Sequence, residues 1–144
     1  MAAGRSIFRI GTGAGFAADR LDAAIDLARR GELDVLVLEC LGERTVAFAH
    51  RDRLADPRRG YNHLLDRRMR ALLPVCQASG TTIITNMGAA NPRAAAERTH
   101  EIARDLGISG LRIACIEGDD VSACVIYGEN QSPPEPVIKR PAPV

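Results

Sequence analysis

The chain has 144 residues, 46% of them hydrophobic and 26% charged, which fits one globular domain. Its net charge of +1 and aromatic content of 3% argue against a dedicated nucleic-acid-binding protein, which needs basic patches and rings that stack on bases. It has no run of about 18 apolar residues, and its first ten residues lack the apolar core of a signal peptide. We therefore expect a cytoplasmic protein that spans no membrane.

The four cysteines, Cys40, Cys76, Cys115 and Cys124, show no CxxC spacing. In a reducing compartment, cysteines without such spacing are usually small buried apolar residues. We expect that role for them here, with no disulfide framework.

Residues 6–10 predict a first strand, and the glycine-rich sequence GTGAG follows at residues 11–15. Gly11, Gly13 and Gly15 are expected to form a loop whose backbone N–H groups can crowd towards an anion. Asp19 is placed to cap the following helix, which Gly31 ends.

A strand, a glycine loop and a helix also begin a dinucleotide-binding unit. Glu39, at the end of the next strand, has the position of a ribose-binding acid. However, the fingerprint is G-x-G-x-x-G, and Phe16 stands where the third glycine belongs. A Rossmann-type nucleotide site is therefore an alternative interpretation.

Residues 34–40 (DVLVLEC) predict a strand that is buried on both faces. Glu39 ends this strand and Glu43 follows about one helical turn later, so both carboxylates can face one crevice. Two such acids can bind a cation or serve as a general acid and base. The alternative is a helix cap and an ion pair with Arg44.

The central unit of the chain is residues 81–98, TTIITNMGAANPRAAAER. Thr81–Thr85 is β-branched throughout and predicts a strand. The loop after it contains Asn86 and Gly88. Asn91 is expected to cap the next helix, with Pro92 at the first helical position.

The remaining elements follow the same order of strand and helix. Helices are expected at residues 45–53, at residues 61–78 with a kink or an early end at Pro74, and at residues 93–106. The sequence DPRRG at residues 56–60 predicts a turn. Leu111–Glu117 predicts a fourth strand, which ends in the polar loop Gly118-Asp119-Asp120.

This order predicts an α/β fold with a mostly parallel sheet of about four β–α units, either an open Rossmann-like sheet or a partial barrel. The strand ends meet at one edge, where α/β proteins bind ligands. We expect an anionic small molecule there, with a divalent cation such as Mg²⁺. The candidate catalytic acids are Glu43 and Asp119, and the candidate metal ligands are Glu39 and Asp120. The candidate ligand-binding residues are Gly11, Gly13, Gly15, Asp19, Arg20, Asn86, Gly88 and Asn91.

The carboxyl-terminal part differs in composition. Residues 121–127 are apolar and predict the start of a fifth strand or a helix. Residues 129–144 are rich in proline and predict an extended, mobile tail. The expected organisation is one α/β domain at residues 1–128 followed by this tail.

Five sequence blocks occur in the order found in the acyclic terpene utilisation AtuA-like family: RIGTGAGFAADR, DVLVLECLGERT, DPRRGY, NMGAANP and GDD. The chain resembles that family over residues 7–120. The resemblance implies a role near the breakdown of citronellol- and geraniol-type compounds through acyl-CoA intermediates. It assigns no reaction, and it leaves open whether this chain is an enzyme. The motif positions that it covers are Gly11, Gly15, Phe16, Asp19, Arg20, Glu43, Thr45, Gly60, Tyr61, Asn86, Gly88, Asn91, Pro92, Gly118, Asp119 and Asp120.

The chain departs from the family pattern in two ways. The block N-A-G-G-x-N-P of the family has Ala89 at its second glycine, which is expected to narrow the loop or forbid a positive φ. Family members also continue further than this chain. A parallel sheet cut after four strands leaves an apolar edge, so we expect poor solubility, a homo-oligomer or a non-catalytic subunit that a partner chain completes.

Overall fold

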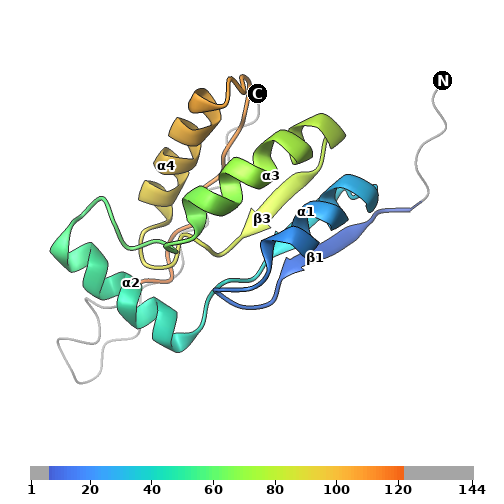
Figure 1. The fold of residues 1–144 in the computed structure, drawn as a ribbon. Coiled ribbons are helices and arrows are strands. Elements are labelled where there is room, and N and C mark those ends of the chain that lie inside the picture. Colours follow the sequence, from blue (N-terminus) through green and yellow to red (C-terminus); the bar gives the residue numbers. More distant parts are fainter. Residues whose placement is uncertain (1–6, 122–144) are drawn as a thin grey trace. The chain divides into compact units, whose positions relative to one another are not determined.

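The computed structural model describes residues 7–121 (Figure 1). The chain divides into two compact units, with the boundary after Ala114, and each is considered by itself. The first unit contains all the helices and strands of the described residues. In order these are β1 (Ile10–Ala14), α1 (Leu21–Arg30), β2 (Val35–Leu38), α2 (Glu43–Ala55), α3 (Leu65–Ser79), β3 (Thr82–Thr85) and α4 (Pro92–Asp105).

The three strands form a parallel sheet in the order β1-β2-β3. Ile10 pairs with Val35, and Val35 pairs with Thr82, so all three strands begin at the same edge of the sheet. The register between β1 and β2 shifts between Thr12 and Ala14. Helices α1 and α3 pack against each other on one face of this sheet, and α4 packs on α3 (Figure 1). The predicted α/β class and parallel sheet are confirmed.

The first strand is displaced from its predicted position. β1 begins at Ile10, so Gly11 and Gly13 lie inside the strand and the expected glycine loop is wrong. A Cβ atom on Gly11 would lie 2.6 Å from Leu33 Cδ1, and one on Gly13 would lie 2.9 Å from Leu36 Cδ1. The two glycines therefore let leucine side chains pack onto the backbone of β1. Part of the expected strand, residue 6, lies outside the described residues.

The predicted fourth strand at Leu111–Glu117 is wrong, because residues 111–121 form neither helix nor strand. Residues 112–121 are exposed, and Ile116 is 89% exposed. An apolar run forms a strand only where other elements cover its side chains, and in this run only Leu111 packs against the core. Residues 7–121 thus contain three strands where about four were expected. The predictions for residues 122–144, including most of the fifth element and the tail, lie outside the described residues.

The helices follow their local signals. Asn91 caps α4 as predicted, since its Oδ1 accepts a hydrogen bond from Ala94 N at 3.3 Å. The turn at residues 56–60 also forms, and Gly60 has a φ of 102°. Helix α3 begins at Leu65, four residues later than predicted, and Pro74 does not end it.

The core lies between the sheet and the helices on its covered face. Its most buried side chains include Leu36, Leu38, Leu65, Leu72 and Ile102. On the opposite face Ile10 is 64% exposed and Ile84 is 55% exposed. No helix of the described residues has the length and apolar character needed to cross a membrane.

Candidate functional site

The carboxyl ends of the three strands bring three loops to one edge of the sheet. These loops are residues 15–20 after β1, residues 39–42 after β2 and residues 86–91 after β3. Glu39 N donates to Ala14 O at 3.0 Å, which joins the end of β1 to the second loop. We take this carboxyl edge as the candidate site, as parallel sheets usually place ligands there.

Two predicted site residues, Glu39 and Asn86, meet at this edge. Asn86 Nδ2 donates to Glu39 Oε1 at 3.0 Å, and Asn86 Oδ1 accepts from Cys40 N at 2.7 Å. Glu39 Oε1 also accepts from Leu41 N at 2.8 Å. The Leu41 N–H and then the Asn86 amide lower the pKa of Glu39, so this carboxylate is ionised at neutral pH. The structure shows a hydrogen-bonded bridge between the loops that follow β2 and β3.

The loop after β1 folds around the Asp19 carboxylate. Asp19 Oδ2 accepts from Gly15 N at 2.8 Å, and Oδ1 accepts from Arg20 N at 2.7 Å. These two N–H groups lower the pKa of Asp19, with a smaller contribution from the charge of Arg68. The prediction that Asp19 caps α1 is wrong, because the N-cap is Arg20, which makes no side-chain capping hydrogen bond. The Gly15 N–H, which was expected to face a ligand anion, therefore bonds to the protein's own carboxylate.

Arg68 is the residue at this edge that the sequence analysis missed. Its side chain is only 2% exposed. The guanidinium donates to Asp19 O at 2.9 Å and to the sulfur of Cys40, so it lies beneath the first two loops. Both acceptors are neutral groups, and no described carboxylate is within ion-pair distance of Arg68. Its position was readable from the sequence, since residue 68 lies three after Leu65 and four before Leu72 on the buried stripe of α3.

The loop after β3 is joined to the turn at residues 56–60. Asn91 Nδ2 donates to Pro57 O at 2.8 Å and to Arg59 O at 2.7 Å, and Ala90 N donates to Gly60 O at 2.9 Å. A Cβ atom on Gly88 would lie 2.7 Å from Pro92 Cα. The structure therefore explains Gly88 and Asn91 by packing and capping, and a ligand-binding role for them stays a prediction.

The remaining candidates are exposed acids of the two units, and a role for them in the site stays a prediction. Glu43 is the exposed first residue of α2. Asp119 and Asp120 are exposed residues of the second unit. Within residues 7–121, no three His, Cys, Asp or Glu side chains gather as a metal site, so the cation predicted at Glu39 and Asp120 has no support there.

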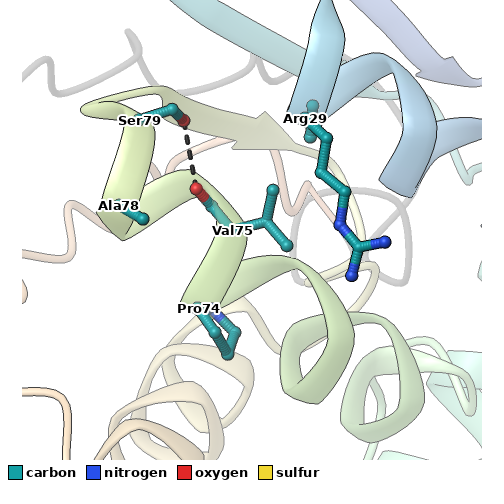
Figure 2. Close-up of a pocket in the computed structure, with 6 residues that line it drawn as sticks. Arg29, Pro74, Val75, Ala78 and Ser79 are labelled. Atoms are coloured by element: carbon teal, nitrogen blue, oxygen red, sulfur yellow. Dashed lines mark hydrogen bonds between the residues drawn. The ribbon is translucent and has the colours of Figure 1, made fainter.

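A shallow cavity of about 450 Å³ lies away from this edge, between the last turns of α1 and α3 (Figure 2). Its lining is mostly apolar, and Arg29 is its one charged residue. Ser79 Oγ donates to Val75 O at 3.1 Å within it (Figure 2). Both helices end here, and the negative ends of their dipoles disfavour an anion.

The thiol predictions are confirmed in part. Cys40 and Cys76 are buried and free, and burial raises the pKa of both, that of Cys76 to about 11. Cys115 is exposed, contrary to expectation. Cys124 lies outside the described residues.

Residues 8–138 match the family described as acyclic terpene utilisation family protein AtuA. The chain belongs to this family. No curated protein and no solved structure matches it.

The AtuA family resemblance gains a structural basis from the fold. The first block forms β1 and its loop, and the second forms β2 and the start of α2. The blocks DPRRGY and NMGAANP, about 30 residues apart, are held together by the Asn91 amide. Three of the five blocks thus lie wholly or partly in the loops at the carboxyl edge of the sheet, and DPRRGY is hydrogen-bonded to one of these loops.

Proposed function

We propose that this AtuA family member takes part in the breakdown of citronellol- and geraniol-type terpenes and binds an anionic acyl-CoA-type ligand at the carboxyl edge. Membership of the family associates the chain with acyclic terpene utilisation. The ligand class is our inference from the resemblance and from the charge at this edge.

The observation that supports the proposal is the buried Arg68. A guanidinium removed from water is costly unless other groups compensate it, and here its two acceptors are neutral. Cys40 does not neutralise it, because burial raises the pKa of that thiol and keeps it protonated at neutral pH. Two backbone N–H groups and, to a smaller extent, the positive charge of Arg68 already lower the pKa of the nearby Asp19 carboxyl. The same positive charge favours a ligand anion at the edge, where the anion can displace or lie beside the Asp19 carboxylate.

The test is thermal unfolding of the chain with and without geranyl-CoA, in the presence and absence of Mg²⁺. A ligand that binds the native state raises the midpoint. We expect geranyl-CoA to raise it for the wild type and for Arg67→Met, which removes an exposed charge next in sequence. Arg68→Met should still unfold cooperatively but lose most of the shift. No shift in the wild type, or equal shifts in both variants, would contradict the proposal.

Glu43 and Asp119 are proposed as the acids that act on the bound ligand, with a divalent cation. Their exposure leaves both carboxylates accessible. Glu43→Gln and Asp119→Asn should each abolish any additional stabilisation by Mg²⁺ while the fold is kept. An unchanged Mg²⁺ response in both variants would remove them from the site.

A second candidate function is that of a non-catalytic subunit that a partner chain completes. The observation that favours it is the sheet face that carries Ile10 and Ile84, over which no described helix lies. Parallel sheets are normally covered on both faces. Copurification of a stoichiometric partner would favour this alternative.

A further inference from the structure

Helix α2 makes no extended packing contact with another described helix or strand. One side of it is nevertheless fixed to the loops at the carboxyl edge. Ala49 is 5% exposed, and its carbonyl oxygen lies close to Gly60. Arg53 donates to Ala90 O at 2.7 Å. These contacts fix which side of α2 faces the rest of the unit and which side faces outward.

The outward side of α2 carries apolar and basic side chains together. Phe48 is 44% exposed and Leu54 is 88% exposed. Successive residues of an α-helix are rotated by about 100° around its axis. Phe48 and Leu54 therefore lie on the same side of α2 as Arg44 and Arg51, opposite Ala49. We call the side formed by Arg44, Ala47, Phe48, Arg51 and Leu54 the outer face of α2.

Both arginines of the outer face are ordered by the same ring. The Arg44 guanidinium carbon lies 5.4 Å from the centroid of the Phe48 ring, and that of Arg51 lies 5.1 Å from it. Cation–π contacts at these distances are favourable and hold long side chains in place. The two arginines, whose Cα atoms are seven residues and about 10 Å apart along the helix axis, thus present their guanidinium groups together at one ring.

The charges of the outer face are largely uncompensated. No described carboxylate lies within ion-pair distance of Arg44. Arg51 lies 3.5 Å from Asp52, with both side chains exposed, which makes a weak pair. A second copy of α2 docked here would bring arginines against arginines, so the charges disfavour self-association and favour an acidic occupant.

We propose that the outer face of α2 binds an acidic amphipathic helix of a partner polypeptide. Apolar side chains of that helix would cover Phe48 and Leu54, and carboxylates about two turns apart would pair with Arg44 and Arg51. Arginine suits this role, because its planar guanidinium binds a carboxylate through two parallel hydrogen bonds.

The test measures the fluorescence anisotropy of a labelled helical peptide that has two glutamates seven residues apart and leucines between them. We expect the full chain to bind it, less tightly as salt is added. Arg44→Gln/Arg51→Gln should weaken binding about tenfold, and Phe48→Ala should weaken it too. The control Arg67→Gln/Arg112→Gln removes the same charge from exposed positions elsewhere and should bind like the wild type.

Four outcomes would overturn the proposal. The first three are no binding of the peptide by the wild type, an equal loss of peptide binding in the control variant, and binding to vesicles of anionic lipid but not to the peptide. The fourth is self-association of the free chain that the Arg44→Gln/Arg51→Gln change abolishes, which would place a second copy on this face. Circular dichroism of each variant establishes that α2 and the fold are retained.

Discussion

Ala89 is the residue at which the chain departs from the family pattern, and the structure shows what this departure does. It adopts a φ of 48°, so the expectation that alanine forbids a positive φ is wrong. The loop is held by hydrogen bonds on both sides, from Ala89 N to Asn86 O at 3.1 Å and from Ala90 N to Gly60 O at 2.9 Å. These bonds impose the left-handed conformation on a residue whose Cβ makes it unfavourable.

We therefore expect Ala89→Gly to stabilise the protein. Glycine adopts the left-handed conformation without the steric cost of a Cβ atom, which raises the free energy of unfolding. The greater entropy of glycine in the unfolded chain offsets part of this gain, so the net increase should be up to about 1 kcal/mol. Urea denaturation measures this change. Ala90→Gly is the control, because Ala90 has no positive φ and is buried; it should lower stability by about 1 kcal/mol. A loss of stability in Ala89→Gly would show that the loop does not need glycine there.

Helices α3 and α4 are joined at the element scale by Arg98 and Asp66. Arg98 Nε donates to Asp66 Oδ1 at 3.0 Å and to Oδ2 at 3.1 Å, and Nη2 also bonds to Oδ2. The Arg98 side chain, first through these hydrogen bonds, lowers the pKa of Asp66. Asp66 and then Glu101, through their hydrogen bonds, raise the pKa of Arg98. This bidentate ion pair helps to fix the angle at which α4 packs on α3.

The lowered pKa of Asp66 predicts a stability that depends on pH. A carboxyl whose pKa is lower in the folded state stabilises the fold above its ordinary value of about 4, and this contribution disappears as the pH falls through the lowered pKa. Asp66→Asn should therefore be less stable than the wild type at pH 7, and the difference should shrink below about pH 4.

Urea denaturation across this pH range measures the effect. Asp105→Asn is a matched control, because its exposed pair with Arg70, at 2.7 Å, is of a kind that contributes little. A difference between wild type and Asp66→Asn that stays constant from pH 7 to pH 3 would contradict the pairing.

At the scale of the molecule, the sheet has helices on one face and exposed apolar side chains on the other. The strand order β1-β2-β3 is shared by the first half of a doubly wound sheet and by a segment of a barrel. In both architectures a further layer or further strands complete the core. The described unit therefore presents Ile10 and Ile84 to solvent as an apolar surface.

We expect this surface to cause association of the isolated chain. Sedimentation velocity over a range of concentrations should show oligomers in the wild type and fewer in Ile10→Thr/Ile84→Thr, because threonine keeps the β-branched shape but weakens apolar contact. The Arg44→Gln/Arg51→Gln variant should associate like the wild type, since α2 lies elsewhere. A monodisperse wild-type monomer that unfolds cooperatively would contradict this expectation.

Local sequence signals were sufficient for much of the fold. The parallel order of strands and helices, the residues of β2 and β3, and the Asn91 cap of α4 follow from periodicity and from capping chemistry. Glu39 and Asn86 were also placed at one edge, because parallel strands end there together. These features depend on residues close in sequence or on a rule of topology.

Tertiary packing alone decided the rest. Glycine is permissive, so only the leucines over Gly11 and Gly13 reveal that these residues lie within a strand. The apolar composition of Leu111–Glu117 suits burial, but a strand forms only where other elements cover its side chains. Arg68 has a charge that favours water, and its burial depends on the carbonyl and thiol that two distant loops bring to it. Each of these outcomes depends on residues far apart in the chain, and local pattern carries no information about such contacts.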